Sequence, residues 1–324
     1  MTEKSLSIPS TAQPKPAACA FDLEAVLSSV VALRAEIPED AFTASILGTE
    51  RAGHGIVIGA KGLILTIGYL ITEAQTIWLV SNAGAAAPAD VVGYDQATGL
   101  GLVQALGRLN VPPIELGSAS AAEVGQQVIV AGHGGRKHAL CAEVVARREF
   151  AGYWEYLLDE AIFTAPPHPN WGGAACIGPD GRLLGVGSLF VQETTDGEPV
   201  EGNMIVPIDL LPPVLEDLQR FGRVRTPARP WLGMYTADTG ADAVVVIGLA
   251  PRGPAQEADI RAGDVVLRVG GAPFADLGGM FRKVWALGPA GVEVPLTVMR
   301  DGKLMEIRLR SADRNDFLKR AAMH

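Results

Sequence analysis

Cysteine, positive charge and long apolar runs are all scarce in this chain, and each shortage excludes a class of protein. The three cysteines, Cys19, Cys141 and Cys176, cannot all pair with one another, and their spacing fits neither a zinc knuckle nor a disulfide framework. The formal net charge of −9 argues against a nucleic acid or an anionic membrane as the main partner. No stretch approaches the roughly 18 continuous apolar residues that span a membrane. We therefore expect reduced thiols and no membrane span.

The first 20 residues are rich in serine and proline, which predicts a flexible tail. They hold Lys4 and Lys15 but no apolar run of signal-peptide length. As written, the sequence predicts a cytoplasmic protein, and a periplasmic chain whose signal peptide had been removed would look the same.

Residues 21–222 show the pattern of a mainly β domain. Apolar residues at helical spacing predict a helix over residues 21–36, which breaks at Pro38. A second helix is expected over residues 208–221, with Asp209 as its N-cap and Gly222 at its end. Between them, short apolar runs separated by glycines are typical of an all-β barrel or sandwich. The runs expected to form strands are residues 55–59, 63–67, 76–80, 91–94, 100–106, 127–131, 142–147, 156–164, 183–191 and 202–207.

A basic, proline-containing linker at residues 223–228 precedes a second domain at residues 229–312, and residues 313–324 form a C-terminal tail. About 85 residues are enough for an independent core. Asp301 and Gly302 lie between two apolar runs and give a strong hairpin signal. The other elements expected in this domain are helices over 254–259 and 276–287 and strands over 232–236, 244–249, 265–270, 294–300 and 304–309.

Several segments of the first domain resemble, in order, the characteristic segments of HtrA/Deg serine proteases. They are residues 53–71 (GHGIVIGAKGLILTIGYLI), 92–103 (VGYDQATGLGLV), 124–132 (VGQQVIVAG) and 167–175 (PHPNWGGAA). The resemblance implies a trypsin-like double six-stranded β-barrel at residues 21–222. It further implies a C-terminal PDZ domain, β-rich with two helices, at residues 229–312.

The resemblance also shows which residues stand at the catalytic positions of the family. The histidine base corresponds to Tyr69, the aspartate that orients it to Gly99, and the serine nucleophile to Trp171. A phenol is a poor proton acceptor at neutral pH, glycine has no side chain, and an indole has no attacking atom. The glycine that donates an N–H to the oxyanion hole corresponds to Pro169, which has no N–H. We therefore predict a pseudoprotease that is not an enzyme.

The second domain resembles a PDZ domain of the HtrA kind. Residues 230–234 (PWLGM) are similar to the family's loop whose N–H groups bind a peptide's terminal carboxylate. Such domains bind an extended peptide by strand addition. The site residues implied are Trp231, Leu232, Gly233 and Met234 in the loop, and Met280, Lys283, Val284 and Leu287 on the helix beside the groove.

The function that these observations favour is binding or scaffolding of protein partners through the PDZ groove, the former catalytic cleft, or both. Protein or peptide C-termini are the expected ligands, and no cofactor or metal is expected. We expect Trp171 to fill the cleft. The resemblance implies a homo-oligomer (a trimer). An alternative hypothesis is a hetero-oligomer in which the chain regulates an active homologue. The rival hypothesis is an enzyme with relocated chemistry, based on the Cys176 thiol or on a metal held by His133, His138 and His168.

Two further features leave alternatives open. The aromatic cluster is either an interface patch or part of the barrel core, and it consists of Phe150, Tyr153, Trp154 and Tyr156. The PDZ groove is either free for a peptide or covered, by the barrel or by the tail at residues 313–324.

Overall fold

The computed structural model describes residues 8–195 and 198–319, which form two compact units. Among the described residues, the first unit comprises 8–148, 160–195, 198–224 and 319. The second comprises residues 225–318 together with the distant segment 149–159, which is the tip of a β-hairpin. No local pattern in the sequence indicates that this segment packs with the C-terminal domain.

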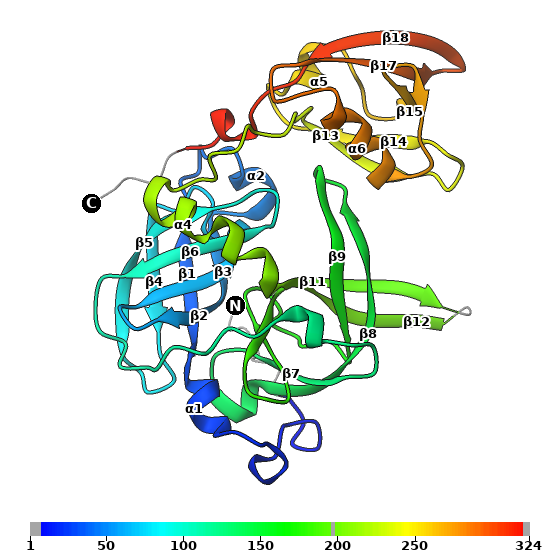
Figure 1. The fold of residues 1–324 in the computed structure, drawn as a ribbon. Coiled ribbons are helices and arrows are strands. Elements are labelled where there is room, and N and C mark those ends of the chain that lie inside the picture. Colours follow the sequence, from blue (N-terminus) through cyan, green and yellow to red (C-terminus); the bar gives the residue numbers. More distant parts are fainter. Residues whose placement is uncertain (1–7, 196–197, 320–324) are drawn as a thin grey trace. The chain divides into compact units, whose positions relative to one another are not determined.

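The first unit contains two closed antiparallel barrels of six strands each, as predicted (Figure 1). The strand orders are β1-β2-β3-β6-β5-β4 and β10-β11-β12-β9-β8-β7. The first barrel is built from β1 (Val30–Glu36), β2 (Glu50–Gly59), β3 (Leu63–Ile67), β4 (Thr76–Val80), β5 (Ala86–Tyr94) and β6 (Leu100–Ala105). The second is built from β7 (Gln127–Ala131), β8 (Ala139–Gly152), β9 (Tyr156–Ala165), β10 (Ala175–Ile177), β11 (Leu183–Thr195) and β12 (Glu198–Pro207).

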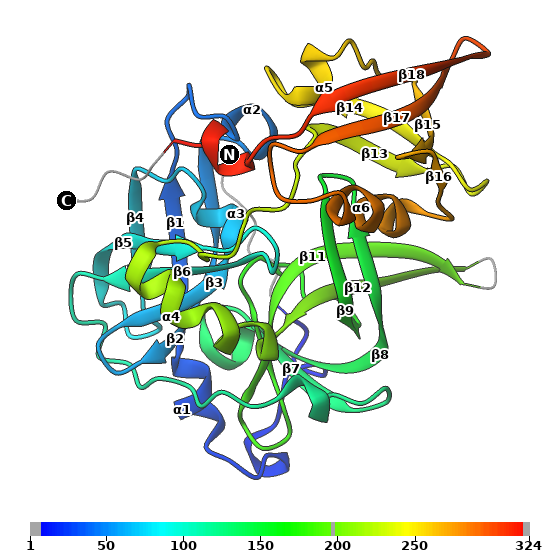
Figure 2. The ribbon, with the colours of Figure 1, turned by 45° about the horizontal axis from the view of Figure 1, so that its top comes forward.

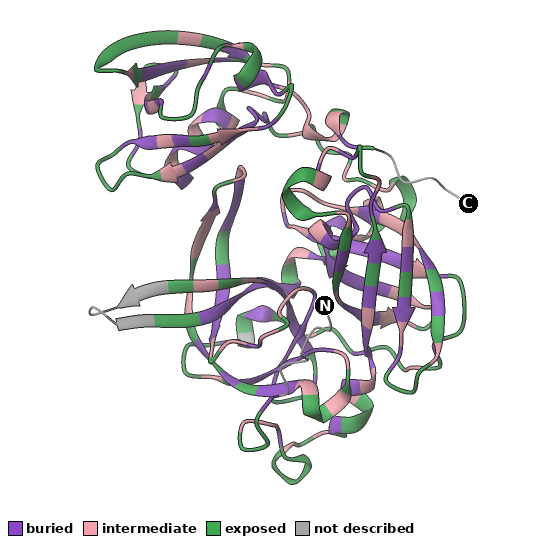
Figure 3. Cartoon of the chain, turned by 180° about the vertical axis from the view of Figure 1, so that it is seen from behind, coloured by how far each residue is buried: buried purple, intermediate pink, exposed green. Residues whose placement is uncertain are grey.

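The helix predicted over residues 21–36 is wrong in its second half. Helix α1 (Leu23–Ser28) begins at the N-cap Asp22 and ends before Val30, where strand β1 starts. Within β1, Leu33 is buried and Arg34 is exposed, the alternation of a strand with one face in the core. β-Branched residues favour this conformation, and β1 pairs with both β2 and β4 to close the barrel. Figure 3 shows the same alternation of buried and exposed residues along the barrel strands.

The helix predicted over residues 208–221 is confirmed from Pro212 onward. Helix α4 (Pro212–Phe221) follows a single 3-10 turn and has a proline in its first turn, where no intrahelical N–H is needed. Gly222 ends it at φ 69°. The predicted cap Asp209 has another role, since its carboxylate accepts hydrogen bonds from the Ser118 hydroxyl (2.9 Å) and the Ala119 N–H (2.6 Å). The short helices α2 (Ala44–Leu47) and α3 (Gly68–Ile71) complete this unit.

The second unit is built on one antiparallel sheet, in the order β13-β14-β15-β17-β18, with β16 paired to β15. Its strands are β13 (Met234–Asp238), β14 (Val244–Leu249), β15 (Val265–Val269), β16 (Ala272–Pro273), β17 (Glu293–Arg300) and β18 (Lys303–Arg310). Two helices, α5 (Pro254–Glu257) and α6 (Leu277–Ala286), complete it, and α6 lies beside β13 and β15 (Figure 2). Within residues 8–195 and 198–319, no helix is long and apolar enough to cross a membrane.

Candidate functional sites

Tyr69 lies on α3, directly after strand β3, where the sequence predicts the position of a lost base. Its hydroxyl donates a hydrogen bond to the carbonyl oxygen of Ser188 at 2.8 Å. Burial raises the pKa of the phenol above its ordinary value, and a hydrogen bond with the Trp171 side chain offsets this only in part. Tyr69 therefore remains protonated near neutral pH and acts as a hydrogen-bond donor.

Gly99 lies in the turn between β5 and β6, at φ 78°, a conformation that favours glycine. Its N–H donates to the carbonyl of Asp95 at 2.8 Å, and its carbonyl accepts from the N–H of Gly68 at 2.7 Å. This residue thus anchors the start of α3 through its backbone and offers no side chain to the cleft.

Trp171 is half-buried and lies in the loop before β10, with its ring centroid 5.6 Å from that of Phe190. The indole thus contacts the Phe190 ring and forms a side-chain hydrogen bond with Tyr69, contacts that are consistent with the predicted filling of the cleft. A pocket of about 250 Å³ is lined by Leu47, Glu50, Arg51, Ala52, Tyr69 and Leu70.

The backbone of this loop is fixed by its two glycines. The carbonyl of Gly172 accepts the N–H of His54 at 2.9 Å. Gly173 has φ 78°, and a Cβ there would lie 2.0 Å from the carbonyl oxygen of His54. The chain therefore needs a glycine at 173 for packing alone, whatever chemistry the loop supports.

Two histidines near this loop serve as neutral structural groups. Nδ1 of His54 accepts the N–H of His133 at 3.1 Å, so Nε2 carries the proton and donates to the carbonyl of Asn170 at 3.1 Å. His168 likewise accepts the N–H of Asn170 at Nδ1 (3.1 Å) and donates from Nε2 to the carbonyl of His138 (3.0 Å). Burial lowers the pKa of His54 to about 3 and also lowers that of His168. Backbone groups thus use all four ring nitrogens.

Cys176 is fully buried in β10, and burial raises the pKa of its thiol to about 12. A thiol of this kind holds almost no thiolate at neutral pH and is a poor nucleophile. No histidine forms a hydrogen bond with it in the part of the chain that the structure describes. Over the same residues, no group of three or more His, Cys, Asp or Glu side chains is placed to hold a metal ion.

The second site is the loop that leads into β13, where the sequence predicts carboxylate binding. Gly233 has φ 75°, and the N–H groups of Leu232, Gly233 and Met234 converge on one point. That point is a carboxylate, the side chain of Glu155. Trp231 is buried against Phe317, with the ring centroids 4.9 Å apart, and its backbone pairs with Ala312.

The four residues predicted on the groove helix differ in burial. Met280 and Val284 of α6 are buried in the core of the second unit together with Met234. Lys283 is half-buried, and Leu287, just after the helix, is exposed.

Known proteins resemble both halves of the chain. Residues 53–186 match the model of the trypsin-like peptidase domain, and residues 226–310 match that of the PDZ domain. The chain is 27% identical over 271 residues to the serine endoprotease DegS of Haemophilus influenzae, which covers 81% of this chain and 77% of that protein. The chain thus contains an HtrA/DegS-like peptidase domain and a PDZ domain.

Other relatives agree with this assignment. The probable periplasmic serine endoprotease DegP-like of Halomonas elongata is 26% identical over 281 residues, which is 83% of this chain and 58% of that protein. This chain therefore spans little more than half the length of that relative. The solved structure of the HtrA-type protease AlgW with a tripeptide shares the fold, with a TM-score of 0.53 and 20% identity over 92% of this chain and 97% of that one.

Sequence reasoning missed two residues at the PDZ site, Glu155 and Leu157. Both lie in the hairpin tip, among the aromatic residues that the sequence singles out. The structure places that cluster in the second unit, since the ring of Tyr153 contacts that of Tyr235 on β13 at 6.0 Å and the ring of Trp154 stacks on that of Tyr156 at 5.6 Å. The only sequence feature that marked Glu155 was its place among acidic residues next to these aromatics. That feature does not indicate contact with the carboxylate-binding loop.

Proposed function

We propose that this HtrA-like chain is catalytically inactive and binds or scaffolds protein partners through its PDZ groove, its former catalytic cleft, or both. The observation that carries the proposal is the state of Tyr69. This residue stands at the position of the base, yet it donates a hydrogen bond to a carbonyl and has a raised pKa. A group in that state does not accept a proton from a nucleophile.

The other catalytic positions support the same conclusion. Trp171 offers no attacking atom, Gly99 offers no carboxylate, and Pro169 has no N–H for an oxyanion. Loss of one oxyanion donor alone lowers a rate by about 10²- to 10³-fold. With nucleophile and base replaced as well, serine-protease chemistry has no reacting group left in this cleft.

Peptide binding by the PDZ domain is supported by the loop geometry. Three N–H groups that converge on one carboxylate form the arrangement that would bind a peptide C-terminus.

Three other aspects of the hypothesis remain predictions. A homo-oligomer, or a hetero-oligomer in which the chain regulates an active homologue, fits a protein that lacks its own chemistry. The sequence predicts a cytoplasmic location, whereas the Halomonas relative is described as periplasmic. An enzyme based on Cys176 is disfavoured by the buried, protonated thiol.

Hydrolysis of fluorescent casein by the purified full chain tests the proposal, with Trp171→Ala and Cys176→Ala measured beside it. We expect no cleavage by any of the three proteins. Cleavage that Cys176→Ala abolishes would establish the relocated chemistry, and cleavage lost in Trp171→Ala would show that the cleft is active. Cleavage that neither substitution affects indicates a contaminating protease, to be removed by further purification before the result is read.

A further inference from the structure

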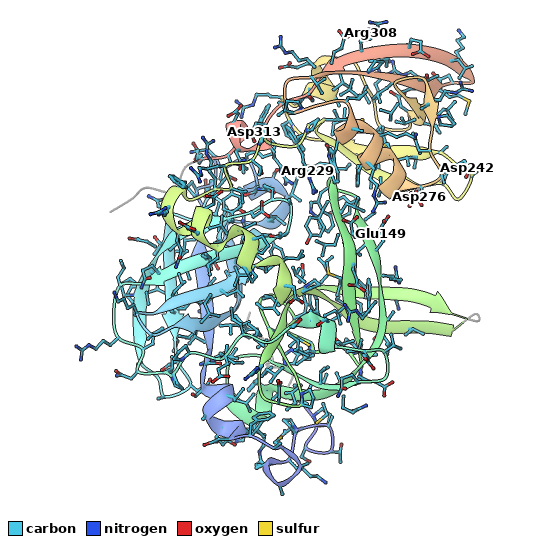
Figure 4. All side chains as sticks on the ribbon, viewed as in Figure 1. Glu149, Arg229, Asp242, Asp276, Arg308 and Asp313 are labelled. Atoms are coloured by element: carbon cyan, nitrogen blue, oxygen red, sulfur yellow. The ribbon has the colours of Figure 1, made fainter. Side chains whose placement is uncertain are left out.

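The carboxylate-binding loop of the PDZ domain is already filled by a segment of the same chain. We call residues 149–159 the tip; it joins β8 to β9 and belongs to the second unit. Figure 4 marks Glu149 on this segment and Asp276 at the start of α6. The tip reproduces, one by one, the interactions that a peptide ligand would make.

The first of these interactions is made by the Glu155 carboxylate. Its Oε1 accepts the N–H groups of Gly233 (2.7 Å), Met234 (3.0 Å) and Leu232 (3.2 Å), and its Oε2 accepts that of Leu232 at 2.9 Å. Glu155 has φ 62°, a conformation that is rare outside glycine and is kept only where the surroundings hold it.

The second interaction is a main-chain hydrogen bond to the edge of the sheet. Strand β13 is the first strand in the sheet order and pairs with β14 on one side only. On its other side, the N–H of Thr236 donates to the carbonyl of Tyr153 in the tip at 3.0 Å. An added peptide strand would use this same donor.

The third interaction is apolar. Leu157 is 6% exposed and belongs to the hydrophobic core of the second unit, together with Met234, Met280 and Val284. A Cβ added at Gly278, on the first turn of α6, would lie 3.4 Å from a methyl carbon of Leu157. The tip thus places a leucine side chain among the residues that the sequence predicts at the groove.

Ion pairs hold the base of the tip against α6. Arg282 donates to Glu149 at 2.6 Å and to Asp159 at 2.5 Å, so one guanidinium bridges both strands of the hairpin. These groups are partly exposed and contribute modestly to stability, but they fix the position of the segment that carries Glu155.

We propose that the tip is a built-in ligand of the PDZ groove, and that a partner with a free C-terminal carboxylate binds only by displacing Glu155. This inference rests on the proposed peptide-binding function and adds its regulation. A ligand tethered to its own site competes at an effective concentration of about millimolar, which no dilute peptide matches. The apparent affinity for a peptide is therefore lowered in proportion to the small fraction of molecules with the tip undocked.

Binding to the full chain tests this proposal, with Glu155→Gly as the variant. Glycine accepts φ 62° without strain, so the substitution removes the carboxylate and keeps the turn. Glu160→Gln is the matched control, because it removes an acidic charge from the same hairpin, where Glu160 pairs with Arg147 outside the second unit. The probe is a pool of fluorescent decapeptides with random last four residues and a free C-terminus, compared with the same pool amidated.

We expect Glu155→Gly to bind the free-carboxylate pool at least about tenfold more tightly than the wild-type chain. We expect Glu160→Gln to bind the free-carboxylate pool with the affinity of the wild type. The amidated pool should bind none of the three proteins. A second measurement, independent of any peptide, is hydrogen–deuterium exchange of the amides at residues 232–234. These amides should be protected in the wild type and exchange faster in Glu155→Gly.

Equal exchange and equal affinity in wild type and Glu155→Gly would overturn the built-in ligand while leaving peptide binding intact. Faster exchange in Glu155→Gly would support the docked tip even if neither protein bound any peptide. The absence of peptide binding would then refute the proposed peptide-binding function of the groove and not the docked tip.

Discussion

The Glu155 carboxylate makes the docking of the tip dependent on pH. The residue as a whole is half-buried, but its carboxylate is enclosed by the loop, and this burial raises its pKa from the ordinary 4.5 to about 7. The hydrogen bonds from Leu232, Met234 and Gly233 and the charge of Arg314 act in the opposite direction but do not outweigh the burial. The docked tip therefore holds a proton more tightly than the free tip does.

The sign and size of the effect follow from this difference. A carboxyl whose pKa is higher in the docked state favours docking at low pH and loses that contribution as the pH rises through about 7. Between about pH 6 and pH 8 the free carboxyl stays ionised, while the docked one changes from mostly protonated to mostly ionised. Docking then weakens by about tenfold, or about 1.4 kcal/mol.

Few other groups near the loop can produce this change. Arg314, Tyr153 and Tyr235 are the charged or titratable side chains whose charges interact with Glu155 or its neighbour, and Tyr235 has a pKa raised by burial. Phenols and guanidinium groups ordinarily titrate well above pH 8. Residues 149–159 and 225–318 contain no histidine.

Fluorescence polarisation with the free-carboxylate peptide pool measures the effect, at constant ionic strength across pH 6, 7 and 8. The wild-type chain should bind up to about tenfold more tightly at pH 8 than at pH 6, since the competing tip is then weaker. Glu155→Gly should show no such trend. A wild-type affinity that falls as the pH rises would refute the reasoning, because it would mean that the ionised carboxylate docks better.

Three further outcomes are expected from the first unit. In urea titrations, Gly173→Ala should lower the free energy of unfolding by at least about 2 kcal/mol more than Gly84→Ala does. Both glycines have positive φ, but only Gly173 lacks room for a Cβ. Equal losses of stability in the two variants would contradict this. Tyr69→Phe should lower stability by about 1–2 kcal/mol, because it leaves a carbonyl unpaired, and should change no activity in the casein assay. Iodoacetamide should leave Cys176 unlabelled in the folded chain and label it after denaturation; labelling under native conditions would show that the thiol is accessible.

Much of the fold could be predicted from local pattern, because strands separated by glycines leave a clear signal. Residues 63–67, 76–80 and 127–131 form strands with the predicted bounds. The error at residues 30–36 has a physical cause: a run of valine and leucine fits helical spacing and strand alternation equally well. Pairing with two neighbours in a closed barrel decides between them, and no local pattern contains that information.

Local sequence also predicts part of the PDZ site and misses the rest. The carboxylate-binding loop could be predicted, because Leu232, Gly233 and Met234 are consecutive and glycine provides the required backbone. The group that fills the loop could not, since Glu155 lies 77 residues before Leu232 and meets it only through tertiary packing. The sequence left open whether the groove was covered, and the residues that fill it come from the hairpin between β8 and β9.

The hydrogen bond from Thr236 to Tyr153 has a consequence for solubility. An uncovered edge strand presents unpaired N–H and C=O groups that pair readily with a strand of another molecule, which leads to aggregation. In the docked state the tip covers the edge of β13. A chain that releases its tip without receiving a peptide would expose that edge, so the same segment that restricts access to the groove also protects the protein from self-association.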